Sequence, residues 1–128
     1  MKVLALDYGS ARTGVAVSDP TGTIARPLGV VRRAADDAGF DELLALVRSQ
    51  EPERVLVGLP LTLRGEVGSQ AEETEQFVEK LRGAVDVPVE TYDERFTTAI
   101  AQTAGGDDAY AAAQLLSDYL RWSTGPAS

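Results

Sequence analysis

An aspartate at the end of a buried strand is the most informative chemical feature of this chain. The apolar run Val3–Leu6 leads directly into Asp7, and the turn 9–13 and a second strand-like run follow it. Burial penalises an ionised carboxylate, so such a group either loses its charge or finds a compensating cation. Asp7 therefore indicates a nearby metal ion or phosphate-bearing ligand. The alternative is an acid that only closes the turn at Gly9.

The residue types that are missing limit the chemistry. The 128-residue chain contains no cysteine and no histidine. Disulfides, structural zinc, thiolate nucleophiles and imidazole bases are therefore excluded. Any metal site must use oxygen ligands, which suits Mg²⁺ or Mn²⁺. Catalysis would use carboxylates, hydroxyls, Lys or Arg together with such a cation.

Two further acidic segments can join Asp7 in a metal site. Asp93 and Glu94 end the last predicted strand, and Asp107 and Asp108 open the last predicted helix. Phosphodiester hydrolysis with two metals needs several carboxylates around ions about 3.5–4 Å apart. We predict Asp7, Glu94 and Asp108 as the catalytic and metal-binding acids, with Asp93 and Asp107 as helpers. Helix capping and the helix dipole are the alternative explanation for the later acids.

The distribution of charge limits the partners. A net charge of −8 argues against nucleic-acid binding through a broadly basic surface. Four glutamates are predicted to lie on one helix face, at positions 72, 73, 75 and 79, whereas the arginines gather at turns and strand ends, at positions 12, 26, 32, 33, 64 and 95. Binding of a polyanion would therefore be local and salt-sensitive. The predicted substrate contacts, which are residues beside the acidic motifs or in the predicted loops, are Arg12, Arg64, Arg95, Thr97 and Thr98. Exposed ion pairs and helix caps are the alternative roles for these side chains.

The predicted elements bring the chemical segments to one edge of a sheet. Strands over 3–6, 14–18 and 25–32 form an antiparallel meander, and runs over 55–59 and 88–92 are typical of parallel strands. Helices are predicted from Asp36 to before Pro52, from a capping box at Ser69–Glu72 to about Val85, over 97–103, and over 107–121. The class is α/β, with a mixed five-stranded sheet flanked by helices. Because function collects at the carboxyl ends of parallel strands, Asp7, the 60–68 loop and Asp93–Arg95 should converge there.

Composition and length predict a single domain over 1–123 with a tail over 124–128. No apolar run is long enough to span a membrane, and because a strand-like run starts at Val3 we expect no signal peptide. We therefore expect a cytoplasmic protein that does not bind membranes. A homodimer and a monomer are both compatible with the sequence.

The motifs resemble those of the YqgF family, also called RuvX. The resemblance includes segments 7–19, 57–61 with Gly65, 93–98 and 108–120, in order and over nearly the whole chain. It implies an RNase H-like fold related to Holliday junction resolvases. It also implies a nuclease that matures the 5′ end of pre-16S ribosomal RNA, with Asp7, Glu94 and Asp108 as its acids.

One segment departs from the family pattern. Only eight residues, 99–106, separate Thr98 from Asp107, where family members have a longer and often basic helical segment. Whether Asp107 or Asp108 is the third acid therefore stays open. The alternative functions are a Holliday junction DNA endonuclease and a non-catalytic adaptor that binds RNA or a ribosome-assembly partner. An actin-like phosphotransferase needs two domains, which this length does not accommodate.

Overall fold

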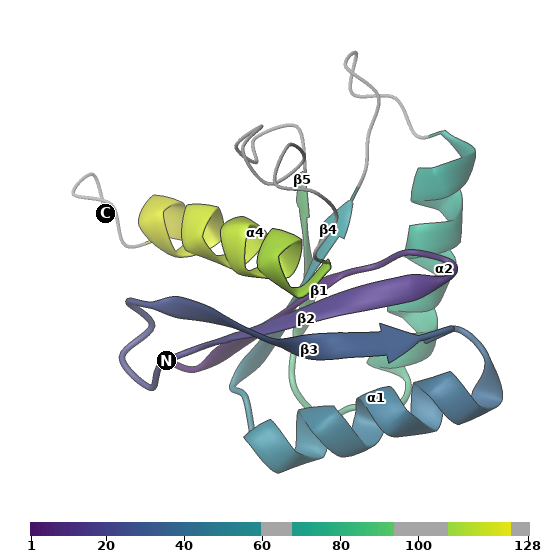
Figure 1. Ribbon diagram of the computed structural model, residues 1–128, viewed down its shortest axis with the longest axis horizontal. Helices are drawn as coiled ribbons and strands as arrows, with labels where there is room; N and C mark the ends of the chain where they lie inside the picture. Colours follow the sequence, from purple (N-terminus) through teal and green to yellow (C-terminus); the bar gives the residue numbers. More distant parts are fainter. Residues whose placement is uncertain (60–67, 94–107, 124–128) are drawn as a thin grey trace.

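The computed structural model describes residues 1–59, 68–93 and 108–123, which form one mixed sheet with helices on both faces (Figure 1). The strands are β1 (Val3–Asp7), β2 (Arg12–Ser18), β3 (Ala25–Arg32), β4 (Arg54–Leu59) and β5 (Val89–Asp93). The helices are α1 (Asp37–Gln50), α2 (Ser69–Arg82) and α4 (Asp108–Ser123). None of the helices in the described part of the chain combines the length and the hydropathy needed to cross a membrane.

The strand order is β3-β2-β1-β4-β5. The first three strands form an antiparallel meander, in which Asp7 pairs with Gly14. Strand β4 then pairs with β1 in parallel, and β5 pairs with β4 in the same direction. The predicted mixed five-stranded sheet is therefore confirmed. Three predicted segments lie wholly or mostly outside the described residues. They are the loop over 60–68, the helical turns over 97–103 and the tail over 124–128.

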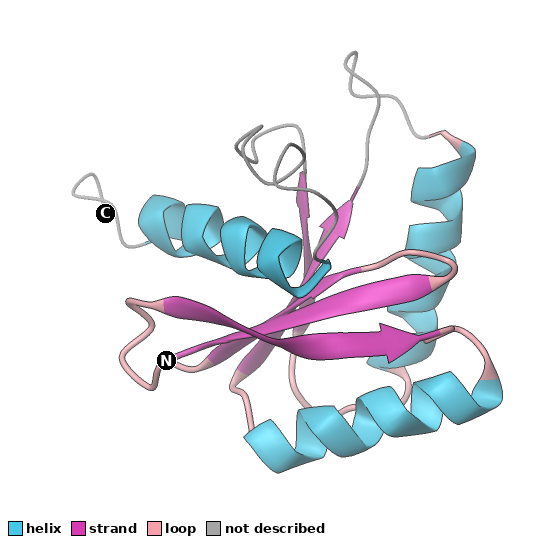
Figure 2. Cartoon of the chain, viewed as in Figure 1, coloured by secondary structure: helices cyan, strands magenta, loops and turns pink. Residues whose placement is uncertain are grey.

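Helices cover both faces of the sheet (Figure 2), and each face has its own apolar core. Leu4 and Leu6 of β1 pack in the cluster that α1 and α2 cover. Val3 and Ala5 pack against α4 on the other face. Because side chains alternate between the two faces of a strand, Asp7 belongs to the face that α4 covers.

Helix α2 differs from the prediction at both ends. Its N-cap is Gly68, which is extended and has no side-chain cap, and the Glu72 N–H donates to the Gly68 carbonyl at 2.9 Å. The predicted capping box is wrong because Ser69 is already the first helical residue, one position too late to cap. The helix also ends at Arg82, whereas Val85 packs against the core from the turn that follows.

The glutamates of α2 do not share one face. Glu72, Glu75 and Glu79 line a common hollow, but Glu73 accepts a hydrogen bond from Tyr8 on another side of the helix. The physical reason is the rotation of about 100° per residue, which separates neighbouring positions of a helix. The predicted single acidic face is therefore wrong for Glu73.

Candidate active site

Three strand ends meet at one edge of the sheet. Asp7 is the last residue of β1, and Leu59 at the end of β4 pairs with Asp93 at the end of β5. Strands β1, β4 and β5 are mutually parallel, so their carboxyl ends lie on the same side. This edge is the one at which the sequence predicted the chemical segments to converge.

Asp7 is half-buried at this edge, and α4 covers the same face of the sheet. Helix α4 runs in the opposite sense to β1 (Figure 1). Its carboxyl half contacts the amino ends of the strands, where the Tyr119 hydroxyl accepts a 2.8 Å hydrogen bond from Nη1 of Arg54. The first residue of α4, Asp108, is therefore at the end of the helix directed toward the carboxyl edge.

The structure describes only part of the predicted acid set. Asp7 belongs to the sheet face that α4 covers, and Asp108 is the first residue of α4. Asp93 is the last residue of the outer strand β5. Glu94 and Asp107 lie outside the described residues. Within residues 1–59, 68–93 and 108–123, no group of three or more acidic side chains gathers as a metal site. The metal-binding role of these acids therefore stays a prediction.

Tyr8 fixes the strand end that contains Asp7. Its ring stacks on Phe77 of α2 with centroids 4.4 Å apart, and Phe77 meets Phe40 edge-to-face. Its hydroxyl donates a 2.8 Å hydrogen bond to Oε2 of Glu73. Burial of the phenol, together with the hydrogen bond and charge of Glu73, raises the pKa of Tyr8 to about 12. Tyr8 was not among the predicted functional residues, although an aromatic residue next to a turn is a usable signal.

Gly9 allows the chain to turn sharply after Asp7 and Tyr8. A Cβ atom at this position would lie 2.5 Å from the carbonyl oxygen of Arg12, a contact that real Cβ atoms essentially never make. The absence of a side chain therefore lets β2 start immediately beside the end of β1. This turn brings Arg12 to the edge that contains Asp7.

Two hollows of different character open at this edge. One, of about 240 Å³, is polar and is lined by Tyr8, Gly9, Ser10, Ser69, Gln70 and Glu73. The other, of about 390 Å³, is basic and is lined by Ala11, Arg12, Arg32 and Arg33. Arg12 was a predicted substrate contact, whereas Arg32 and Arg33 were noted only as strand-end arginines. The remaining predicted contacts, Arg64, Arg95, Thr97 and Thr98, lie outside the described residues.

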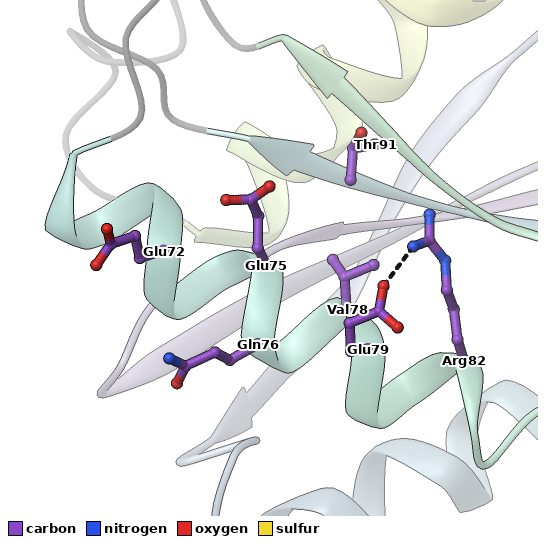
Figure 3. A pocket seen from close by; sticks show the side chains of 7 residues that line it. All are labelled: Glu72, Glu75, Gln76, Val78, Glu79, Arg82 and Thr91. Atoms are coloured by element: carbon purple, nitrogen blue, oxygen red, sulfur yellow. Dashed lines mark hydrogen bonds and ion pairs between the residues drawn. The ribbon is translucent and has the colours of Figure 1, made fainter.

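A larger hollow of about 640 Å³ lies between α2 and β5 (Figure 3). Three glutamates line it, and Glu79 forms an ion pair with Arg82 at 2.7 Å. The negatively charged side chains of this lining repel the negatively charged phosphates of a polyanion, because like charges repel each other. Size alone therefore does not make this hollow the nucleic-acid site.

A family model described as "RuvX: Holliday junction resolvase" matches residues 1–122. The chain belongs to the RuvX family. Two relatives that this chain resembles in sequence are each described as "Putative pre-16S rRNA nuclease". The protein of Roseiflexus sp. (strain RS-1) is 43% identical over 101 residues, which are 79% of this chain and 72% of the relative. The protein of Desulforamulus reducens is 39% identical over 102 residues, which are 80% and 74% of the two chains.

Solved structures confirm the fold of this RuvX chain. Thermus thermophilus RuvC in complex with a Holliday junction substrate superimposes with a TM-score of 0.60 at 21% identity, covering 98% of each chain. The fowlpox virus resolvase, also in complex with a Holliday junction, gives a TM-score of 0.52 at 11% identity, over 96% of this chain and 95% of the other. At such identities the likeness concerns the fold, which is RNase H-like, as the motif resemblance implied.

Proposed function

We propose that this RuvX-family chain is a divalent-metal-dependent nuclease that acts in maturation of the 5′ end of pre-16S ribosomal RNA. The observation that supports it most directly is the position of Asp7. Asp7 ends a central strand at the edge where the parallel strands terminate, on the face covered by the helix that Asp108 opens. The names of the curated relatives support the choice of substrate.

The available donor atoms fit a hard divalent cation. Asp7, Glu94 and Asp108 are the proposed ligands, with Asp93 and Asp107 beside them in the sequence as helpers. Carboxylate oxygens suit Mg²⁺ or Mn²⁺, and the chain contains no His or Cys that would favour a softer metal. When bound, the cation supplies positive charge that stabilises the phosphoryl oxygens and promotes ionisation of the attacking water.

The protein's own contribution is positioning. Tyr8, held between Phe77 and Glu73, keeps the end of β1 against α2, so Asp7 is presented from a rigid strand end. Arg12 follows through the tight turn at Gly9 and offers a guanidinium to a substrate phosphate. Arg64, Arg95, Thr97 and Thr98 belong to the same proposal as further substrate contacts. With no thiol or imidazole present, water is the proposed nucleophile and no covalent enzyme intermediate forms.

A panel of three substrates tests the proposal. The full chain is incubated with a ribosomal precursor fragment containing its 5′ extension, an unrelated single-stranded RNA and a four-way DNA junction, each with Mg²⁺ or Mn²⁺. We expect cleavage of the precursor at the 5′ boundary of the mature RNA. Asp7→Asn should abolish it, whereas Asp86→Asn should not, because Asp86 is exposed in the loop that precedes β5 at the opposite edge.

A resolvase is the second candidate, since the matched family model is described as a Holliday junction resolvase. Preferential symmetric cleavage of the four-way junction would replace the RNA assignment with this activity. Binding of RNA without cleavage of any substrate, under all metal conditions, would instead indicate a non-catalytic adaptor.

A further inference from the structure

Three arginines gather in the basic hollow beside the Asp7 edge. Arg12 opens β2 and lies directly opposite Arg32 at the end of β3, and Arg33 follows immediately. All three are exposed. Like charges on directly opposed strand positions destabilise a sheet. A phosphate placed beside these guanidinium groups would be attracted by all three positive charges together.

The backbone holds Arg33 in an unusual conformation. Its φ is 50°, in the left-handed region that favours glycine. The Arg33 N–H donates to the Ala11 carbonyl at 3.0 Å, and the Arg33 carbonyl accepts from the Asp36 N–H at 2.9 Å. A Cβ on Gly39 would lie 2.1 Å from the Arg33 carbonyl oxygen, so the first turn of α1 packs directly on this turn. A strained arginine held in the wall of a hollow is the kind of outlier that suggests a function.

The known partner of Arg33 is a weak one. Its Nη1 lies 3.7 Å from Oδ2 of Asp36, and the two side chains are 77% and 64% exposed. Exposed ion pairs of this length contribute little to stability, because water and salt screen them. A phosphate, which offers several oxygens to a guanidinium, can therefore replace or share this contact.

Arg12 and Arg32 of this hollow lie on the same face of the sheet as Asp7, and Arg33 follows directly after the end of β3. Ala16 of β2 packs in the cluster under α4, so alternation places Gly14 and Arg12 on that face too, with Arg32 opposite Arg12. Gly14 pairs with Asp7. From the standard strand spacings, the Cα atoms of Arg12 and Arg32 lie about 8 and about 12 Å from that of Asp7. A few nucleotides of extended strand span this separation.

We infer that the hollow formed by Arg12, Arg32 and Arg33 binds backbone phosphates of the nucleic-acid strand on one side of the cleavage position. The inference rests on the proposed nuclease function and adds a defined site for the flanking strand. Such a site would let a chain with a net charge of −8 bind a polyanion, since the attraction is local. Guanidinium contacts to phosphate do not distinguish RNA from DNA. The hollow therefore positions a strand of either kind.

Binding measured without divalent cation tests this inference separately from cleavage. Fluorescence anisotropy of a labelled single-stranded RNA, in EDTA and over a series of salt concentrations, compares the unaltered chain with Arg32→Gln and Arg33→Gly. Loss of one phosphate contact should lower the log–log salt slope by about 0.7, which is about fivefold in affinity near 0.1 M salt. Arg26→Gln is the matched control, an exposed arginine at the other end of β3.

Arg33→Gly separates binding from folding. Glycine adopts the left-handed conformation without strain, so this variant should unfold at a temperature at least as high as that of the unaltered chain and still bind less tightly. Unchanged affinity and salt slope in both Arg32→Gln and Arg33→Gly would overturn the inference, even if the protein cleaves RNA. Undetectable binding by the unaltered chain would overturn it too. Arginine-dependent binding with no cleavage of any substrate would uphold the hollow and refute the nuclease proposal.

Discussion

Removal of one hydroxyl, in Tyr8→Phe, should weaken the attachment of the Asp7 strand end to α2. The substitution keeps the ring on Phe77 and deletes only the 2.8 Å hydrogen bond to Glu73. A hydrogen bond to a charged acceptor contributes about 1.5–3 kcal/mol to stability. Glu73 is exposed and regains water when the bond is lost, so we expect a smaller loss, about 1 kcal/mol. For a chain of this length the unfolding entropy converts that loss to a fall of about 4 °C in Tm.

The pH dependence of this loss identifies its cause. The pKa of Tyr8 is raised to about 12 in the folded protein, against an ordinary value of 10.0. A raised pKa means that the hydroxyl contributes its full stability below pH 10 and loses it as the pH rises toward 12. The difference in unfolding free energy between the unaltered chain and Tyr8→Phe should therefore be constant near neutral pH and shrink between pH 10 and 12.

Urea denaturation of the unaltered chain, Tyr8→Phe, Glu73→Gln and the double variant measures the coupling between the two side chains. We expect the two single losses to overlap, so that the double variant loses less than their sum. Equal stability of Tyr8→Phe and the unaltered chain, or strictly additive losses, would refute the role assigned to this hydrogen bond.

Three further outcomes follow from the same structure. Gly9→Ala should lower the unfolding free energy by about 1–3 kcal/mol in urea, because its Cβ would overlap the Arg12 carbonyl, whereas Gly83→Ala should be tolerated since its nearest contact is 3.7 Å. Asp19 accepts hydrogen bonds from two backbone N–H groups and a threonine hydroxyl, which lower its pKa to about 2. The stability advantage of the unaltered chain over Asp19→Asn should then be full above about pH 4 and disappear as the pH falls toward 2, as thermal unfolding across that range would show. Nuclease activity should stop in EDTA and return with Mg²⁺ or Mn²⁺ but little with Ca²⁺. Calorimetry should show weaker Mn²⁺ binding by Asp7→Asn than by the unaltered chain. Cleavage in excess EDTA would contradict the metal-dependent mechanism.

Local sequence patterns were sufficient to predict the strands and helices of the described residues and the class of chemistry. Alternation and apolar runs identified all five strands, and the 3.6-residue period identified α1, α2 and α4. The position of Asp7 at a strand end is also a local property, because an apolar run stops there. The absence of His and Cys restricts any metal site to oxygen ligands, and this conclusion needs no structure at all.

The partners of individual side chains required the tertiary structure. Glu73 looks like its glutamate neighbours in the sequence, and only the packing of α2 against Tyr8 separates it from them. Ser69 has the sequence of a cap, but the helix starts one residue earlier than that role requires. The hollow of Arg12, Arg32 and Arg33 depends on the register between β2 and β3 and on a left-handed backbone at position 33.

The face of the sheet on which Asp7 lies was likewise decided by tertiary contacts. Alternation within β1 establishes that Asp7 shares a face with Val3 and Ala5, but not which helix covers that face. That depends on α4, which begins about a hundred residues later and packs on those two side chains. Periodicity indicates which residues of one strand or helix point the same way. Which helix covers a face depends on the burial of apolar surface between segments far apart in the sequence, and no short stretch of sequence contains that information.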